Sequence, residues 1–151
     1  MKYLTVIFLL ISSLSQASEN NEVDIFIESF YHNFSQRNFK KIAEEYFHKD
    51  AQFIFGEHIM VPGNATEIES VFLAIIDSLE KEDYQKSVVR SISKNYTGNT
   101  YVVATIYFDR FKKNKEKLDS MCSTYSIVKL AGSWKILAWF PSKPEKEDSC
   151  F

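Results

Sequence analysis

Asp109 is the residue whose neighbours best suit acid–base chemistry. The side chains that alternate with it would share its face of a β-strand; they are Tyr101, Val103, Thr105 and Tyr107. A carboxylate that ends a row of Tyr and Thr is the best polar pocket lining in this sequence, so Asp109 and Tyr107 are candidate catalytic residues. The alternative is a strand-end carboxylate that pairs with Arg110 or Lys112.

His58 is a second candidate, because an imidazole that faces a pocket can act as a general base near neutral pH. The alternative is a polar residue near a strand edge. Glu57 alternates with His58 and would share a face with Phe53 and Phe55. An aromatic setting would raise the pKa of the Glu57 carboxyl, unless this side chain has simply reached the rim.

The sequence shows no pattern that indicates a metal site, a phosphate-binding loop or a nucleophilic serine. The histidines, His32, His48 and His58, are scattered without a cluster of carboxylates or cysteines, so we expect no metal site. A Gly-rich phosphate loop and a Gly-x-Ser-x-Gly elbow are both missing, and no cofactor is expected. A formal net charge of −2 at pH 7, without a basic run, argues against nucleic-acid binding.

The size and composition predict one domain with an aromatic interior. The chain has 151 residues, of which 45% are hydrophobic and 15% aromatic. Thirteen Phe and eight Tyr against four Gly indicate a core, or a cavity, lined by rings. A disordered chain carries far fewer such residues.

Residues 1–17 are predicted to be a signal peptide. Lys2 precedes an apolar run from Leu4 to Leu14, which is too short to span a bilayer, and Ser15-Gln-Ala17 offers small residues for cleavage. We expect cleavage after Ala17, a secreted or periplasmic protein, and no membrane contact afterwards. The alternatives are an uncleaved anchor and a buried helix.

Export favours a disulfide between Cys122 and Cys150, because an even cysteine count in an oxidising compartment indicates pairing. This bond would tie the tail, residues 143–151, to the strand that Cys122 opens. The alternative is two free thiols.

Hydrophobic periodicity predicts helices first and strands later. Apolar residues recur at helical spacing over 23–34, over 39–47 up to a closing His48–Asp50, and after a capping box of Thr66 and Glu69. The predicted strands are 51–55, its partner 57–61, 84–95, 100–111, 123–130 and 133–140.

This order predicts an α+β domain with its helices packed on one face of an antiparallel sheet. In strand 84–95, alternation would place Val88, Arg90, Ile92 and Lys94 on one side. The apolar second face of strand 100–111 predicts a homodimer through the open sheet face. The alternative is that curvature and the tail cover this face.

Several segments together resemble a known family. They are an aromatic first helix, Arg37-Asn-Phe-Lys-Lys-Ile-Ala-Glu-Glu-Tyr-Phe, Lys49-Asp-Ala-Gln-Phe entering a strand, the helix after Pro62-Gly63, and Tyr125-Ser-Ile-Val-Lys-Leu-Ala-Gly-Ser-Trp-Lys-Ile. Over residues 22–140 the chain resembles the nuclear transport factor 2-like superfamily, which includes polyketide cyclases and ketosteroid isomerase. The resemblance implies one domain over 18–142, with a cone-shaped, strongly bent antiparallel sheet wrapped around an N-terminal helix pair and a third helix.

The enzymes of that superfamily imply catalytic residues that this sequence matches incompletely. The strand base of ketosteroid isomerase falls on Phe55, and its helix tyrosine falls on or beside Phe30, next to Tyr31. The carboxylates and arginine of the epoxide hydrolase type have only Asp109, Glu57 and Arg90 as candidates. The dehydratase type needs pocket histidines, for which His58 is the one candidate on a strand.

We therefore expect an exported, dimeric, non-catalytic domain that binds a small apolar or amphipathic ligand, or a partner segment, in an aromatic pocket. The predicted pocket residues are Phe30, Tyr31, Phe34, Tyr46, Phe53, Phe55, Phe72, Tyr101, Tyr107, Tyr125 and Trp134. One alternative is an isomerase, dehydratase or cyclase that uses Asp109, His58 and Tyr31 or Tyr107. The other is a structural dimerisation or accessory module.

Overall fold

The structure, a computed structural model, describes residues 21–146, 149 and 150, and the predicted signal peptide lies outside these residues. The described part opens with an N-terminal helix over residues 21–35. The elements that follow are α2 (Phe39–Lys41), a turn of π-helix η1 (Ile42–Tyr46), β1 (Phe47–Phe55), β2 (His58–Met60), α3 (Ala65–Glu80), β3 (Tyr84–Thr97), β4 (Tyr101–Lys112), β5 (Lys117–Leu130) and β6 (Ser133–Ser142).

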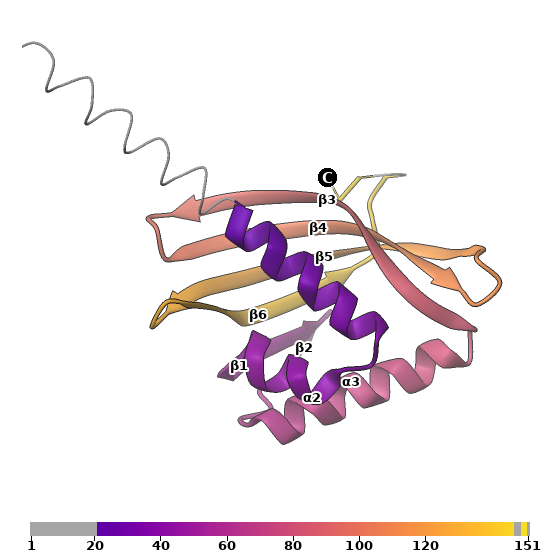
Figure 1. The fold of residues 1–151 in the computed structure, drawn as a ribbon, viewed down its shortest axis with the longest axis horizontal. Coiled ribbons are helices and arrows are strands. Elements are labelled where there is room, and N and C mark those ends of the chain that lie inside the picture. Colours follow the sequence, from indigo (N-terminus) through magenta and orange to yellow (C-terminus); the bar gives the residue numbers. More distant parts are fainter. Residues whose placement is uncertain (1–20, 147–148, 151) are drawn as a thin grey trace, which may run out of the picture.

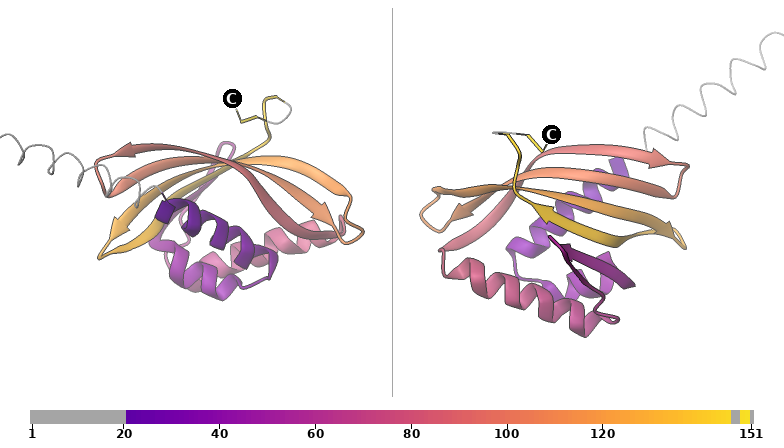
Figure 2. Two further views of the ribbon diagram at one scale, coloured as in Figure 1. Left: turned by 45° about the horizontal axis from the view of Figure 1, so that its top comes forward. Right: turned by 180° about the vertical axis from the view of Figure 1, so that it is seen from behind.

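The strands form one sheet in the order β2-β1-β6-β5-β4-β3, and the helices cover one face of it (Figure 1). The sheet is strongly bent, with the helices on its concave face and the C-terminal tail on its convex face (Figure 2). This confirms the predicted α+β fold. One pair departs from the expected antiparallel pattern, because β1 and β6 run parallel.

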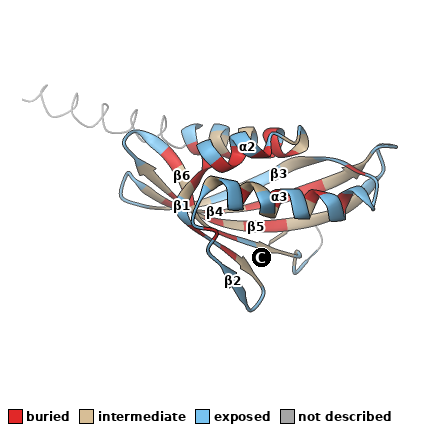
Figure 3. Cartoon of the chain, turned by 90° about the horizontal axis from the view of Figure 1, so that it is seen from below, coloured by how far each residue is buried: buried red, intermediate tan, exposed pale blue. Residues whose placement is uncertain are grey.

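The apolar stripes that predicted the helices are their buried faces. Val23, Ile27, Phe30 and Phe34 of the N-terminal helix are buried at helical spacing. The buried residues of α3 also lie on the side toward the sheet, while its outer side is exposed (Figure 3). These faces and the concave sheet face enclose the core, with Phe72 of α3 in contact with several rings.

The start of α3 lies earlier than predicted. Asn64 is the N-cap: its Oδ1 accepts a hydrogen bond from the Glu67 N–H at 3.0 Å, and its Nδ2 donates to Glu67 Oε1 at 2.7 Å. The predicted box of Thr66 and Glu69 was wrong, because the pair that caps the helix stands two residues upstream.

The second helical segment ends earlier than predicted, and β1 already begins at Phe47. His48–Asp50 therefore belong to a strand and do not close a helix. Lys135 Nζ donates to the carbonyl oxygens of Glu44 and Glu45, at 3.0 and 2.6 Å. A lysine from β6 thus satisfies carbonyls at the helix end, which a local pattern cannot reveal.

The side assignment predicted for strand 84–95 was also wrong. The register of β3 against β4 shifts between Val89 and Ser91, so strict alternation fails at Arg90. Val88 lies opposite Asp109, whereas Ile92 lies opposite the buried Ile106. The bulge therefore puts Arg90 on the convex face and Ile92 on the concave face.

Candidate functional site

A cavity of about 180 Å³ lies between the helices and the concave face of the sheet. The N-terminal helix, α3 and every long strand contribute to it. Its lining residues are Phe30, Tyr31, Phe34, Phe55, Ile75, Leu79, Ser87, Phe108, Arg110, Met121, Ser123, Tyr125, Trp139 and Pro141. Most of them are apolar, so the cavity offers a small molecule an environment far from that of water.

The structure brings part of the predicted aromatic set to this cavity. Phe30, Tyr31, Phe34, Phe55 and Tyr125 line it. They reach it from the N-terminal helix, from β1 and from β5. Their edge-to-face and tilted ring contacts, such as Tyr31 with Phe108 at 4.6 Å between centroids, fix the shape of the wall.

Three predicted pocket residues do not line the cavity, because they pack into the surrounding core. Phe53 and Phe72 contact each other edge to face, at 6.0 Å between ring centroids. The Tyr46 hydroxyl lies 2.7 Å from Ser29 Oγ and accepts a hydrogen bond from Asn33 Nδ2 at 3.0 Å. These side chains support the site and do not contact its space.

The other three predicted pocket residues lie elsewhere. Alternation along β4 places Ala104, Ile106 and Phe108 on the concave face, so Tyr101 and Tyr107 belong to the convex face. Trp134 lies near the start of the N-terminal helix, where its Nε1 donates to Glu22 Oε2 at 3.2 Å.

Four polar side chains in the cavity wall form one buried cluster. The hydroxyl oxygens of Tyr31 and Tyr125 are 3.0 Å apart, and Trp139 Nε1 donates to Ser123 Oγ at 3.1 Å. The Ser123 hydroxyl also interacts with both phenols. All four side chains are at most 8% exposed. The cluster therefore sits in an environment of low polarity, where hydrogen bonds are strong.

Burial raises the pKa of the Tyr31 phenol well above its ordinary value, and it raises the pKa of Tyr125 in the same direction. Both groups therefore keep their protons at physiological pH. The bond between the two phenols uses one of the two protons. The other can be donated to Ser123 or to an acceptor atom in the cavity, such as a carbonyl oxygen.

Arg110 is the one charged residue in the described lining, and its charge is balanced. Its Nε donates to Asp119 Oδ1 at 2.6 Å, and its Nη2 bonds the second carboxylate oxygen. Such a two-point pair fixes both side chains. Among the described lining residues there is no carboxylate, imidazole or amine.

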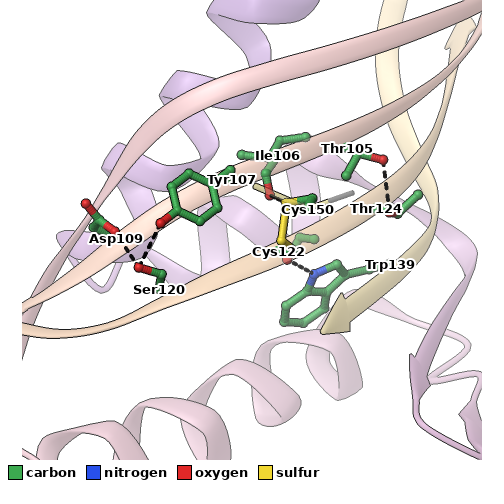
Figure 4. The surroundings of a disulfide bond; sticks show 10 residues. Thr105, Ile106, Tyr107, Asp109, Ser120, Cys122, Thr124, Trp139 and Cys150 are labelled. Carbon is green, nitrogen blue, oxygen red and sulfur yellow. Dashed lines mark hydrogen bonds between the residues drawn. A yellow bond between two sulfur atoms is a disulfide. The ribbon is translucent and has the colours of Figure 1, made fainter. Parts of the chain in front are cut away.

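The catalytic candidates do not converge at the cavity. Asp109 and Tyr107 meet on the convex face, where Tyr107 Oη donates to Ser120 Oγ at 3.0 Å and Ser120 Oγ donates to Asp109 Oδ1 at 2.8 Å (Figure 4). Tyr31 lies on the other side of the sheet. His58 is exposed on β2, and Glu57 is exposed in the turn before it.

Asp109 is the centre of an ion cluster. Arg90 Nε donates to its Oδ2 at 2.7 Å, and Lys117 Nζ lies 2.8 Å from its Oδ1. Burial alone would raise the pKa of the Asp109 carboxyl, but hydrogen bonds from Lys117, Ser120 and Arg90 outweigh it and hold that pKa below its usual range. The group is therefore charged at neutral pH, which suits a structural anchor.

Cys122 and Cys150 form the predicted disulfide, which fastens the tail to the convex face of β5 (Figure 4). The Tyr107–Ser120 pair lies beside this bond. Within the described ranges, no helix has the length and apolar character needed to cross a membrane.

A family model described as "NTF2-like protein (DUF6841)" matches residues 20–144. No curated protein matches the sequence significantly.

Similar folds occur among solved structures. An NTF2-like protein with a cystatin-like fold from Novosphingobium aromaticivorans superposes with a TM-score of 0.73 at 9% identity, over 92% of this chain and 90% of that one. ActVI-ORFA from Streptomyces coelicolor superposes with a TM-score of 0.70 at 15% identity, over 86% of this chain and 98% of that one. A protein from Catenulispora acidiphila in complex with S-DNPA superposes with a TM-score of 0.64 at 15% identity, over 83% of this chain and 92% of that one.

Proposed function

The chain belongs to the NTF2-like family DUF6841, and from its cavity we propose that it binds a small apolar or amphipathic molecule without transforming it. The observation that carries this proposal is an apolar cavity of about 180 Å³ with two protonated phenols in its wall. Apolar walls with a few placed polar groups are typical of ligand sites.

The chemistry of the lining supports binding rather than turnover. An acid–base enzyme needs a group that takes and returns a proton near its operating pH. The phenols of Tyr31 and Tyr125 have pKa values raised by burial and serve as donors. Asp109 and Tyr107 lie across the sheet from them, so the residues of the enzyme alternative are separated.

The phenol pair suits a ligand that carries a hydrogen-bond acceptor. A carbonyl or ether oxygen can accept the phenol proton that otherwise goes to Ser123, whereas a hydrocarbon cannot accept it. The Catenulispora neighbour in complex with S-DNPA supports the view that this fold can hold a small molecule.

We also propose that the protein acts outside the cytoplasm, as a secreted or periplasmic domain. The Cys122–Cys150 bond supports this, because disulfides persist in oxidising compartments. The signal-like segment over residues 1–17 points the same way. Fractionation of the native cells should place the mature chain outside the cytoplasm, starting at Ser18, and an uncleaved N-terminus in the cytosol would overturn this part.

A cavity-filling variant tests where a ligand binds. Acetophenone, a ring with a short carbonyl substituent, is expected to bind the wild type in calorimetry and to raise its melting temperature. In Leu79→Phe the added ring occupies cavity space, so acetophenone binding is lost. Leu73→Phe is the matched control, because Leu73 lies on the same helix with its side chain exposed.

Acetophenone and ethylbenzene, which lacks the carbonyl oxygen, test the polar half of the proposal. The wild type is expected to prefer acetophenone by roughly threefold to tenfold, the value of one net hydrogen bond. A Tyr31→Phe/Tyr125→Phe variant should bind the two equally. Failure of both compounds to bind the wild type, or equal binding to wild type and Leu79→Phe, overturns the proposed function.

A further inference from the structure

A second apolar hollow, of about 510 Å³, lies on the surface between β2 and α3. We call it the β2–α3 groove; its lining residues are Phe55, Met60, Ser70, Val71, Ala74, Ile75 and Ser78. The two polar members are serines, so the groove contains no charged side chain among the described residues.

The groove and the cavity share two side chains, Phe55 and Ile75. Both are half-buried, as expected of residues that stand between an interior space and the surface. The cavity and the groove therefore adjoin at an apolar boundary formed by Phe55 and Ile75.

The opposite side of the cavity is polar. Tyr31 and Ser87 line the cavity, and they also line a separate hollow that contains Glu28, His32 and Lys86. The Arg110–Asp119 ion pair adds further charge to the cavity wall. A hydrocarbon group that leaves the cavity avoids these charges on the β2–α3 side.

The size of the cavity limits what it can hold alone. An apolar protein cavity of about 150 Å³ holds one benzene molecule, and this cavity measures about 180 Å³. It therefore accepts one ring with a short substituent. Any longer molecule has to continue outside it.

The groove is open to solvent on its β2 side. Met60, which lines it, is 44% exposed. Ile59 is the neighbour of Met60 on this strand and points to the opposite face of β2. A tail that lies in the groove therefore covers the exposed part of Met60.

We propose that the ligand has a ring-sized head with an oxygen acceptor and an unbranched apolar tail. The head lies in the cavity against Tyr31 and Tyr125, and the tail passes Phe55 and Ile75 into the β2–α3 groove. This inference rests on the proposed function and adds the class of molecule to it.

A series of phenyl ketones with one head and growing tails tests the inference: acetophenone, butyrophenone, hexanophenone and octanophenone, titrated by calorimetry. Each methylene that enters the groove should tighten binding by about threefold to fourfold. In Ala74→Glu a charge enters the groove from an exposed position of α3. This variant should bind acetophenone as the wild type does and lose at least tenfold for octanophenone.

Leu73→Glu is the matched control, because it places the same charge on the neighbouring residue, which does not line the groove. Circular dichroism melting of both variants shows that α3 is intact. If acetophenone binds and affinity stays flat along the series, or if both variants weaken octanophenone equally, the tail site is wrong while the proposed function stands. If no ketone binds the wild type, both fail together.

Discussion

At the scale of single residues, the buried phenols of Tyr31 and Tyr125 determine what the cavity can recognise. Two hydroxyls 3.0 Å apart in a ring-lined space are expensive to leave without partners. Ser123 and Trp139 complete their surroundings and were not among the predicted residues. With Leu130 opposite Ser133, uninterrupted pairing would set Tyr125 against Ala138, but a bulge between Ser126 and Ile127 brings Trp139 there.

The phenols predict how stability changes at alkaline pH. Burial raises the pKa of Tyr31 and Tyr125 in the folded protein, whereas the pKa of a tyrosine in the unfolded chain is about 10. Their contribution is complete below that pH and is lost as pH rises toward the folded pKa values, by up to about 1.4 kcal/mol per pH unit per phenol. Urea unfolding between pH 9 and 11 should show a smaller loss in Tyr31→Phe/Tyr125→Phe, and identical slopes would contradict it.

For Asp109 we expect the opposite pH dependence of stability, seen at acid pH. Its pKa is held below the usual value, so its contribution is present above about 4 and is lost as pH falls through the folded pKa. Asp109→Asn should destabilise the protein by about 2 kcal/mol at pH 7, because Arg90 and Lys117 lose their partner. Denaturation at pH 7 and pH 3 checks this, and a pH-independent difference would refute the ionic explanation. Acetophenone binding should stay unchanged.

At the scale of elements, the sequence predicted what local periodicity controls and missed what distant partners impose. The helices followed from apolar spacing, and strands 123–130 and 133–140 followed from their alternation. The start of β1 at Phe47 depends on Lys135 and on pairing with β6. The bulge at Arg90 likewise depends on β4, so the face of Ile92 could not be assigned from its own strand.

Removing the disulfide should lower the stability of the protein and leave ligand binding in the cavity unchanged. It joins residues 28 positions apart, and removing such a link costs about 3 to 4 kcal/mol on the chain-entropy account. Cys122→Ala/Cys150→Ala should lower the free energy of unfolding by that amount. Because the bond lies on the convex face, acetophenone affinity should be retained, and a parallel loss of affinity would contradict the separation of the two faces.

At the scale of the whole molecule, the convex face is where we propose that two copies meet. The tail covers the part around Tyr107 and Cys122, and the rest exposes Phe140 at 39% together with half-buried Val103 and Val128. Apolar and small side chains on an open sheet suit a self-complementary contact.

The dimer prediction is tested by sedimentation over a range of concentrations. The wild type should sediment as a homodimer at micromolar concentration. Ser126→Arg, which places a charge in the middle of that face, should give a monomer that still binds acetophenone. Lys113→Glu in the exposed β4–β5 loop is the surface control. A wild-type monomer at every concentration rules the contact out.

The parallel pairing of β1 with β6 affects the order in which the molecule can be made. Phe47 pairs with Ile136, so a strand from the first third of the chain waits for one near its end. Until β6 is synthesised, β1 has only the three-residue β2 beside it, and the wall formed by Trp139 and Pro141 does not exist. Closing such a distant contact is slow. A chain that ends before β6 therefore lacks both this parallel pairing and one wall of the cavity.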